Sequence, residues 1–231
     1  MTATAWSTLH VEARTHGRVL VRSPRLSPPW PVLVGFHGYA ETAEIHLAAL
    51  ERIPGVDRWF VAAVQALHPF YTRQQTVVAN WMTSQDRELA LADNIDYVGR
   101  ALNRLRDEHN LSAAPVFVGF SQGGAMAYRA AANFESAGLI ILAADVPPDV
   151  AQQPNVRLPP ALIGRGTGDE WYTADKHSAD LATLARLGVP VESCVFEGGH
   201  AWGDEFLNTA ARFLTKTALN AHSSLDQARR P

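Results

Sequence analysis

Short apolar runs alternate with longer amphipathic stretches along most of the chain. Residues 32–36 form a continuous apolar run, the pattern of a strand that is buried on both faces. Residues 87–109 instead place apolar side chains at helical spacing, the pattern of a helix with one buried face. Strand-like runs occupy 32–36, 59–64, 116–118, 139–142, 161–164 and 190–196, and helical patterns occupy 41–53, 87–109, 122–133, 174–187 and 202–218. This order predicts an α/β protein with a mostly parallel central sheet and helices on both faces.

Three segments fall outside this alternation. Two short β-like runs on either side of residues 15–17 predict an opening hairpin over residues 6–22. Residues 65–86 have no clear period and carry aromatic side chains and a proline, so we expect a short, lid-like segment, a minimal lid with a function of its own. Residues 220–231 are polar and predict a flexible tail. The length of 231 residues suits a single domain, which we place at 1–219.

Composition narrows the class of protein. Hydrophobic residues make up 47% of the chain, enough to offset the entropy of ordering it, so the chain as a whole is not disordered. The formal charge of −3 gives no basic excess, and we expect no nucleic-acid partner. The single cysteine, Cys194, excludes an intrachain disulfide and fits an inert core residue. Neither a signal peptide nor a membrane-spanning run is visible, so we expect a cytoplasmic protein without stable membrane insertion.

The strongest chemical signal is the sequence Gly119-Phe120-Ser121-Gln122-Gly123. It matches Gly-x-Ser-x-Gly between a predicted buried strand and a predicted helix, where such a turn exposes the serine hydroxyl at the sheet edge. The N–H groups at the start of the helix point to the same place. Ser121 is therefore the predicted nucleophile, although a glycine turn that serves only close packing would share the pattern.

A serine nucleophile needs a histidine as base, and three histidines follow Ser121 in the chain. His200 lies between a predicted strand and the last predicted helix, in a loop at the same sheet edge as the serine. His222 falls in the expected tail. His177 lies among charged residues of a predicted helix, where we expect a solvated surface side chain. His200 is therefore the predicted base.

The base in turn needs an acid that orients it. Asp169 follows the predicted strand 161–164 through a glycine-containing turn, which brings it to the same sheet edge. Asp145 follows the preceding strand and opens on that edge as well, so it is the main alternative. We interpret Glu170 and Asp175 as residues of a helix entry. Asp169 is the predicted acid.

Acyl transfer also needs N–H donors for the oxyanion that develops on the substrate. The N–H of Gln122, directly after the serine, is one predicted donor. The other is the N–H of Tyr39, in the loop His37-Gly38-Tyr39-Ala40 that follows the strand 32–36. We interpret His37 itself as a buried residue that braces this loop.

Four motifs in this order resemble the phospholipase/carboxylesterase branch of the α/β-hydrolases, which includes the acyl-protein thioesterases. They are His37-Gly38, residues 119–124, residues 166–169 and Gly199-His200. The resemblance covers roughly residues 30–216 and implies the α/β-hydrolase fold with a serine esterase activity that needs no cofactor. The chain departs from the family at two places: many members read His-Gly-Leu-Gly-Asp where residues 37–41 are His-Gly-Tyr-Ala-Glu, and Trp-Phe/Tyr-Asp where residues 81–83 are Trp-Met-Thr.

The leading hypothesis is a serine carboxylic-ester hydrolase that acts on short to medium acyl esters through an acyl-enzyme, with a small-molecule ester as its partner. A thioesterase, a lysophospholipase or an acyltransferase would use the same residues, and a non-catalytic binding module would be expected to lack one of the three. Tyr71, Trp81 and Trp171 are candidate substrate contacts because aromatic side chains often line such sites. Exposed aromatics near the lid could also serve a homodimer. No histidine–carboxylate cluster has metal-ligand spacing, so we expect neither a metal nor a cofactor.

Overall fold

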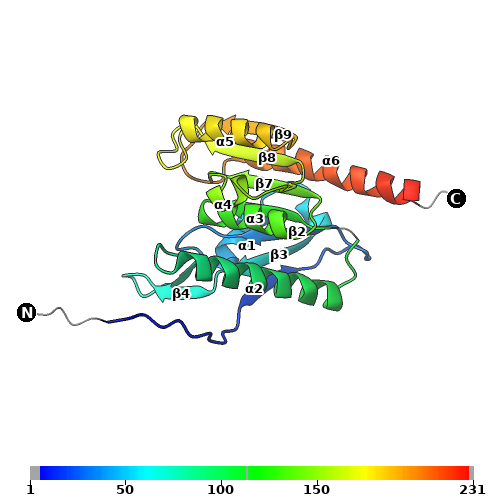
Figure 1. The fold of residues 1–231 in the computed structure, drawn as a ribbon. Coiled ribbons are helices and arrows are strands. Elements are labelled where there is room, and N and C mark those ends of the chain that lie inside the picture. Colours follow the sequence, from blue (N-terminus) through cyan, green and yellow to red (C-terminus); the bar gives the residue numbers. More distant parts are fainter. Residues whose placement is uncertain (1–5, 113, 229–231) are drawn as a thin grey trace, which may run out of the picture.

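A mostly parallel sheet forms the centre of the structure, a computed structural model that describes residues 6–112 and 114–228, with side chains up to residue 219. Within these residues the sheet has seven strands in the order β1-β3-β2-β6-β7-β8-β9 (Figure 1). β1 runs antiparallel to β3, and every other neighbouring pair is parallel. The strands are β1 (Arg18–Arg22), β2 (Val32–Phe36), β3 (Phe60–Gln65), β6 (Val116–Phe120), β7 (Gly138–Leu142), β8 (Ala161–Gly166) and β9 (Val191–Phe196).

Helices cover both faces of this sheet. Their bounds are α1 (Ala43–Glu51), η1 (Val56–Arg58), α2 (Arg87–Glu108), α3 (Gln122–Asn133), α4 (Pro148–Ala151), α5 (Ala174–Arg186) and α6 (Asp204–Ala228). α2, α3, α4 and α5 contribute to one hydrophobic cluster, and α1, η1 and α6 contribute to another. In β2, Val34 and Phe36 join the first cluster and Leu33 joins the second, because successive side chains of a strand point to opposite faces. The predicted architecture is therefore confirmed.

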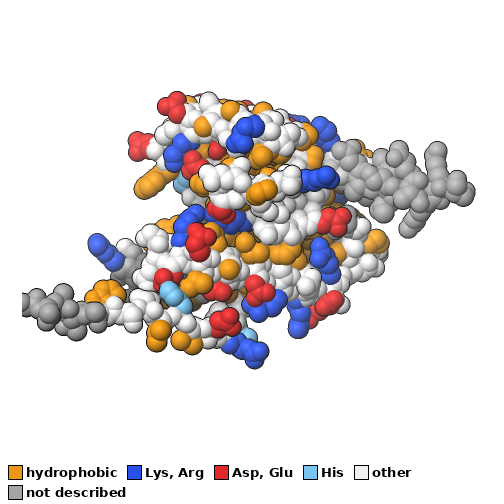
Figure 2. All heavy atoms as spheres, in the orientation of Figure 1, with side chains coloured by type: hydrophobic (Ala, Val, Ile, Leu, Met, Phe, Trp, Pro, Cys, Tyr) orange, Lys and Arg blue, Asp and Glu red, His pale blue; other side chains and the backbone are white. Residues whose placement is uncertain are grey.

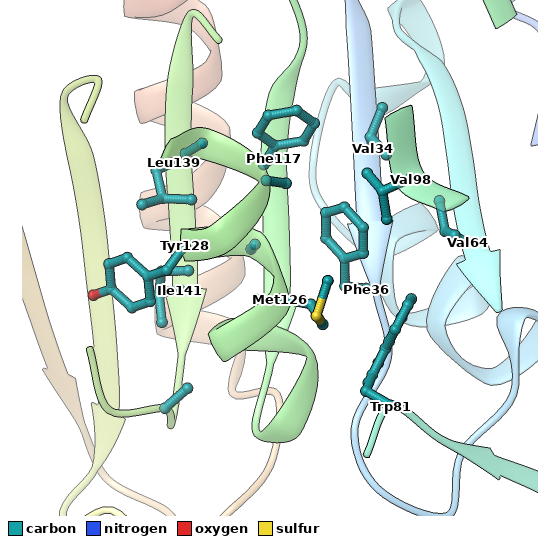
Figure 3. Close-up of a cluster of buried hydrophobic side chains, with 14 of the residues drawn as sticks. Val34, Phe36, Val64, Trp81, Val98, Phe117, Met126, Tyr128, Leu139 and Ile141 are labelled. Atoms are coloured by element: carbon teal, nitrogen blue, oxygen red, sulfur yellow. The ribbon is translucent and has the colours of Figure 1, made fainter. Parts of the chain in front are cut away.

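Figure 3 shows the middle of the first cluster, where α3 packs on the sheet. The rings of Phe36 and Trp81 meet edge to face with their centroids 5.6 Å apart, and the Met126 side chain lies close to both (Figure 3). All three side chains are fully buried, and each such burial stabilises the fold by roughly 1.5–3 kcal/mol. The core thus extends beneath the end of β2, so the loop that follows this strand has a rigid base.

The ends of the predicted elements agree closely with those of the structure. β2 and α3 have the predicted bounds, and the other elements differ by a few residues at their ends, where helices fray. The short elements η1 and α4 were not predicted. Each is a single turn or less, too short to show a hydrophobic period.

The hairpin predicted over residues 6–22 is wrong. Only β1 is a strand, and it pairs with β3 through Val19 and Val64. Residues 6–17 lie exposed without regular structure. They bury no side chains, so no hydrophobic gain offsets the entropy of ordering a second strand.

The segment 65–86 is more regular than its sequence suggested. It contains a small antiparallel hairpin of β4 (His68–Tyr71) and β5 (Val77–Asn80). Its pattern is irregular because β4 is largely exposed whereas most of β5 is buried, so the two strands share no common alternation. The hairpin lies beside the loop that follows β2, where Glu41 forms an isolated antiparallel bridge with Ala79.

The last helix is longer than predicted. The sequence placed its end at residue 218 and a flexible tail from 220, whereas α6 continues to Ala228 and extends past the sheet (Figure 1). No glycine or proline stands between Asp204 and Arg230, so nothing in the sequence breaks the helix. The remainder of the expected tail, residues 229–231, lies outside the described residues.

An ion pair between a buried arginine and a partly exposed aspartate joins α4 to α3. The guanidinium of Arg129, which is 1% exposed, donates from Nε and Nη2 to the two carboxylate oxygens of Asp149, each at 2.7 Å. Burial alone would raise the pKa of Asp149, but the hydrogen bonds and charge of Arg129 outweigh burial and leave the pKa lowered. The charged form of Asp149 is therefore favoured by folding.

We expect Asp149→Asn to lower the free energy of unfolding by about 2–3 kcal/mol near neutral pH, because it leaves a buried guanidinium without its counter-charge. The folded-state pKa of Asp149 lies below the unfolded one. The contribution is thus present above the unfolded pKa of about 4 and is lost as the pH falls through the folded pKa. Urea unfolding of both proteins across this range measures it. A difference that stays constant down to low pH would contradict the assignment.

Candidate active site

A strained turn places Ser121 between β6 and α3. Its backbone has φ 52° and ψ −123°, a combination of angles that residues other than glycine rarely adopt. The turn needs glycine on both sides of the serine, because the neighbouring backbone leaves no room for a Cβ. A Cβ on Gly119 would lie 2.4 Å from the Gly123 oxygen, and one on Gly123 would lie 2.0 Å from the Phe36 oxygen. The predicted strand–turn–helix context of the serine is thus present in the structure.

Ser121, His200 and Asp169 form a continuous chain of hydrogen bonds. The His200 Nε2 lies 2.8 Å from the Ser121 Oγ, and its Nδ1 lies 2.8 Å from the Asp169 Oδ2. Ser121 follows β6, Asp169 follows β8 and His200 follows β9, so the three residues meet at the carboxyl edge of the parallel sheet. The structure therefore brings together the predicted nucleophile, base and acid.

The loops that carry the base and the acid are joined through their backbones. The N–H of Gly168 donates to the Gly198 oxygen at 2.7 Å, and the N–H of Thr167 donates to the Phe196 oxygen at 2.8 Å. A Cβ on Gly166 would come within 2.3 Å of the Gly199 oxygen. These contacts fix the two loops relative to each other before any substrate binds.

The Asp169 carboxylate is buried and fully hydrogen-bonded. It is 4% exposed, and its Oδ1 accepts the N–H groups of Trp171 at 2.9 Å and Tyr172 at 2.8 Å. The alternative acid, Asp145, is exposed and pairs with Lys176 at 3.2 Å. The structure therefore places Asp169, and not Asp145, against His200.

The prediction that His177 is a solvated surface residue is wrong. His177 is 6% exposed, and its Nε2 lies 3.1 Å from the Ser193 Oγ. Its ring also meets Tyr172 at right angles. Burial lowers the pKa of His177, and the charge of Arg165 lowers it further. The adjacent charged residues misled the prediction, because Asp175 and Lys176 are exposed whereas His177 faces the interior. The side chain of His222 lies outside the described residues.

His37 braces the loop after β2, as predicted. It is fully buried; its Nε2 accepts the N–H of Ala66 at 3.0 Å, so its Nδ1 carries the proton and donates to the Gly38 oxygen at 2.7 Å. Burial lowers the pKa of His37, against a smaller opposing effect of the Gly38 oxygen. The ring is thus neutral, with both nitrogens used to hold the loop.

Glu41 closes the same loop. Its Oε2 accepts the N–H of Gly38 at 2.7 Å. Burial raises the pKa of Glu41, while the Gly38 N–H and the charge of His200 act in the opposite direction. Between these residues, Ala40 has φ 57°, a left-handed conformation that favours glycine. This is a position where many relatives of the resembled family have glycine.

The backbone N–H groups predicted as oxyanion donors lie at the two sides of this arrangement. Gln122 is the first residue of α3, and Tyr39 stands in the loop between Gly38 and Ala40. Within the described residues, neither N–H is used in a hydrogen bond. Both are therefore available as donors, which a site for a developing negative charge requires.

The prediction that Trp81 contacts the substrate is wrong, since its side chain is 0% exposed. It instead connects the predicted oxyanion elements. Its indole N–H donates to the His37 oxygen at 2.9 Å, and its backbone N–H donates to the Gln122 Oε1 at 2.9 Å. The Gln122 side chain in turn donates to the Met82 oxygen at 3.0 Å. Sequence reasoning missed this role, because the paired contacts come from segments far apart in the chain.

The hairpin adds a backbone connection to the same loop. The N–H of Ala40 donates to the Ala79 oxygen at 3.1 Å, and the N–H of Ala79 donates to the Glu41 oxygen at 2.9 Å. Asn94 of α2 donates to the Trp81 oxygen at 2.6 Å. The segment expected to be only a cover is thus also a support for the loop after β2.

Several aromatic side chains remain at the surface around the site. Tyr71 is 68% exposed and Trp171 is 77% exposed, so both stay free to meet a substrate. Tyr39 is also exposed, and its ring lies 5.7 Å from that of Phe70. The Phe120 ring packs against His200 with centroids 5.0 Å apart.

Three further features of the chain bear on the site: groups of possible metal ligands, long apolar helices and the distribution of surface charge. Among residues 6–112 and 114–228, no group of three or more His, Cys, Asp or Glu side chains is placed to hold a metal ion. No helix in the described part of the chain is long and apolar enough to cross a membrane. Acidic and basic side chains are intermixed on the face drawn in Figure 2, and neither sign forms a continuous patch there.

Comparisons with known proteins identify the fold. No protein-family model matches the chain, and no curated protein matches it. Among solved structures, esterase PE8 matches with a TM-score of 0.71 at 20% identity, covering 88% of this chain and 100% of that one. A Bacillus cereus carboxylesterase gives 0.69 at 16% identity over 87% and 94% of the two chains, and a Dyadobacter fermentans phospholipase/carboxylesterase gives 0.65 at 18% over 87% and 97%. The chain therefore has the α/β-hydrolase fold, as its motifs predicted.

We expect Ala40→Gly to raise the free energy of unfolding by roughly 0.5–1 kcal/mol, because it relieves a left-handed conformation at a cost in unfolded-state entropy. The matched control is Ala48→Gly, an exposed position in α1, where the same change should lower the free energy of unfolding by about 1 kcal/mol. Urea denaturation measures both. A loss of stability in Ala40→Gly equal to that of the control would contradict the assignment of strain.

Proposed function

We propose that this protein is a serine carboxylic-ester hydrolase that acts through an acyl-enzyme. One observation carries the proposal: Ser121, on a strained turn at the carboxyl edge of the sheet, is hydrogen-bonded to His200, which is hydrogen-bonded to Asp169. The resemblance of the motifs to the phospholipase/carboxylesterase branch supports it, as do the esterases among the structural neighbours.

In the proposed reaction, the Ser121 Oγ attacks the carbonyl carbon of the ester. His200 Nε2 takes the hydroxyl proton and then gives it to the departing alcohol. Water next attacks the acyl-enzyme, with His200 again as base, and releases the acid and the free serine. Asp169 accepts the Nδ1–H of His200. It thereby keeps Nε2 free to accept a proton and stabilises the imidazolium that forms in each step.

The negative oxygen of the tetrahedral intermediate would be held by the N–H groups of Gln122 and Tyr39. Each such donor typically contributes about 3–4 kcal/mol to stabilisation of the transition state. That contribution depends on donors that are fixed in place beforehand. The Gln122 side chain and the Trp81 indole, which tie the two donor segments to one another, supply this rigidity.

The alternative of a non-catalytic binding module loses support from the same geometry. A protein that only binds would gain nothing from backbone strain at Ser121 or from a fully hydrogen-bonded acid behind His200. Strain of this kind costs roughly 1–3 kcal/mol and persists where it serves function.

We expect Ser121→Ala and His200→Ala each to reduce kcat on p-nitrophenyl acetate by about 10⁴-fold or more, and the double variant to be little worse than either, because the two side chains act as a unit. Asp169→Asn should also reduce kcat strongly, since the amide favours the wrong histidine tautomer. Stopped assays on purified, folded variants measure these losses.

Asp145→Asn is the matched control for the acid, since Asp145 pairs with Lys176 instead of His200, and it should keep kcat near that of the wild type. Wild-type turnover by Ser121→Ala would overturn the proposed function. A larger loss in Asp145→Asn than in Asp169→Asn would overturn only the choice of acid.

The exposed hairpin leads us to propose a preference for short to medium acyl esters. Tyr71 is exposed on a hairpin of only four residues per strand, which can form a shallow apolar groove but not a deep enclosure. We expect Tyr71→Ala to lower kcat/KM for p-nitrophenyl octanoate by about 10-fold more than for the acetate, since a lost apolar contact is worth about 1–3 kcal/mol.

A series of p-nitrophenyl esters of rising chain length tests this preference. Val21→Ala, an exposed apolar position on β1, is the control and should leave the chain-length profile unchanged. A maximal rate on the hexadecanoate ester that Tyr71→Ala does not alter would contradict the groove.

A further inference from the structure

A second buried hydrogen-bonded network lies directly behind the acid. The N–H of Tyr172 is one of the two donors to the Asp169 Oδ1. The side chain of the same tyrosine is 1% exposed and belongs to the hydrophobic cluster that contains Phe206. Its backbone therefore faces the triad, and its phenol points into the protein interior.

The buried hydroxyl of Tyr172 is hydrogen-bonded to a second carboxylate, that of Asp180. It donates to the Asp180 Oδ2 at 2.8 Å, and the Asp180 Oδ1 accepts the N–H of Val146 at 3.1 Å. Asp180 is 7% exposed and lies on α5, whereas Val146 lies in the loop after β7. One side chain thus joins the acid-bearing loop to two neighbouring elements.

The proposed reaction does not use Asp180, yet its burial is costly. Burial raises the pKa of Asp180, while the hydrogen bonds from Tyr172 and Val146 act in the opposite direction. An isolated buried carboxylate is destabilising unless its oxygens are well hydrogen-bonded. A buried charge whose two oxygens bind two different loops fixes the geometry of both.

We propose that Asp180, acting through the Tyr172 hydroxyl, is a positioning residue for the catalytic acid. This inference rests on the proposed function. The Asp180–Tyr172 hydrogen bond fixes the segment whose N–H groups hold the Asp169 Oδ1, and so keeps the Oδ2 in line with the Nδ1–H of His200.

Within the described part of the chain, few other charged or titratable groups lie close enough to Asp180, Tyr172 or His200 to influence the pH dependence of the reaction. The titratable and charged groups that act on Asp180 and its partner tyrosine are Tyr172, Tyr128, Asp145 and Lys176. The ring of His177 meets that of Tyr172 edge to face, and the charge of Arg165 lowers the pKa of His177. Close to His200 the charged groups are Asp169 and Glu41.

The decisive variant is Tyr172→Phe, which removes one hydroxyl and changes no charge. Without the hydroxyl, the segment that holds Asp169 is no longer fixed, and the shifted carboxylate would stabilise the protonated His200 imidazole less. We therefore expect kcat on p-nitrophenyl acetate to fall by about 10- to 100-fold. The acidic limb of the kcat/KM profile should move to lower pH by about half a unit or more. KM for this small ester should change little, since the hydroxyl does not face the substrate.

Ser193→Ala is the matched control. It removes the neighbouring hydrogen bond to His177 at the junction of α5 and β9 and should move neither kcat nor the acidic limb. Asp180→Ala should reproduce the loss of Tyr172→Phe, and the double variant should be no slower than Asp180→Ala. If Tyr172→Phe does not fold, the single variant Asp180→Ala tests the same step.

Folded Tyr172→Phe or Asp180→Ala with wild-type kcat and an unmoved acidic limb would overturn the inference. A loss of stability alone, without either kinetic change, would also overturn it. Failure of the proposed function looks different, because the wild type itself would then hydrolyse no ester. In that case the downfield Nδ1–H proton resonance of His200 is the readout, and its persistence in Tyr172→Phe would still overturn the positioning role.

Discussion

The backbone of Gly123 packs against the backbone of Phe36 and His37 so closely that a Cβ there would lie 2.0 Å from the Phe36 oxygen. This contact between α3 and the end of β2 has two consequences. It forces the turn that holds Ser121 in its strained conformation. It also sets the separation between the serine and the loop after β2, which carries Tyr39. The nucleophile and the proposed oxyanion donors are therefore positioned by one and the same packing contact.

The remaining parts of the site depend on this frame in layers. Backbone hydrogen bonds between the loops after β8 and β9 bring Asp169 to His200. On the other side, the hairpin and Trp81 hold the loop after β2 against α3. Preorganisation of this kind matters because a displacement of about 1 Å at the reacting atoms can cost about 100-fold in rate.

Much of the fold could be predicted from the sequence, and so could the three residues Ser121, Asp169 and His200 of the site. The inner strands β2, β6 and β7 are continuous apolar runs. Ser121, Asp169 and His200 each follow a strand of the parallel part of the sheet. Because parallel strands end at the same edge of the sheet, the position of each residue directly after a strand was enough to predict that the three lie close together.

Contacts made by side chains across distant segments could not be predicted in this way. Trp81 looked like a loop aromatic, and only the tertiary structure reveals that its indole is buried against the loop after β2. His177 looked solvated because charged residues surround it in the sequence, although it lies on the inner side of α5. The residue type of Ala40 does not indicate its left-handed conformation, because alanine is compatible with almost any local pattern. Only the glycine that many members of the resembled family have at this position pointed to it.

The central claim is that His200 activates Ser121 as a nucleophile. Labelling with a fluorophosphonate, followed by peptide mass spectrometry, tests it most directly. We predict a single adduct on Ser121 in the wild type, and labelling that is slowed by orders of magnitude in His200→Ala with the fold intact. Adducts on another residue, or unchanged labelling of Ser121 without the histidine, would contradict the account.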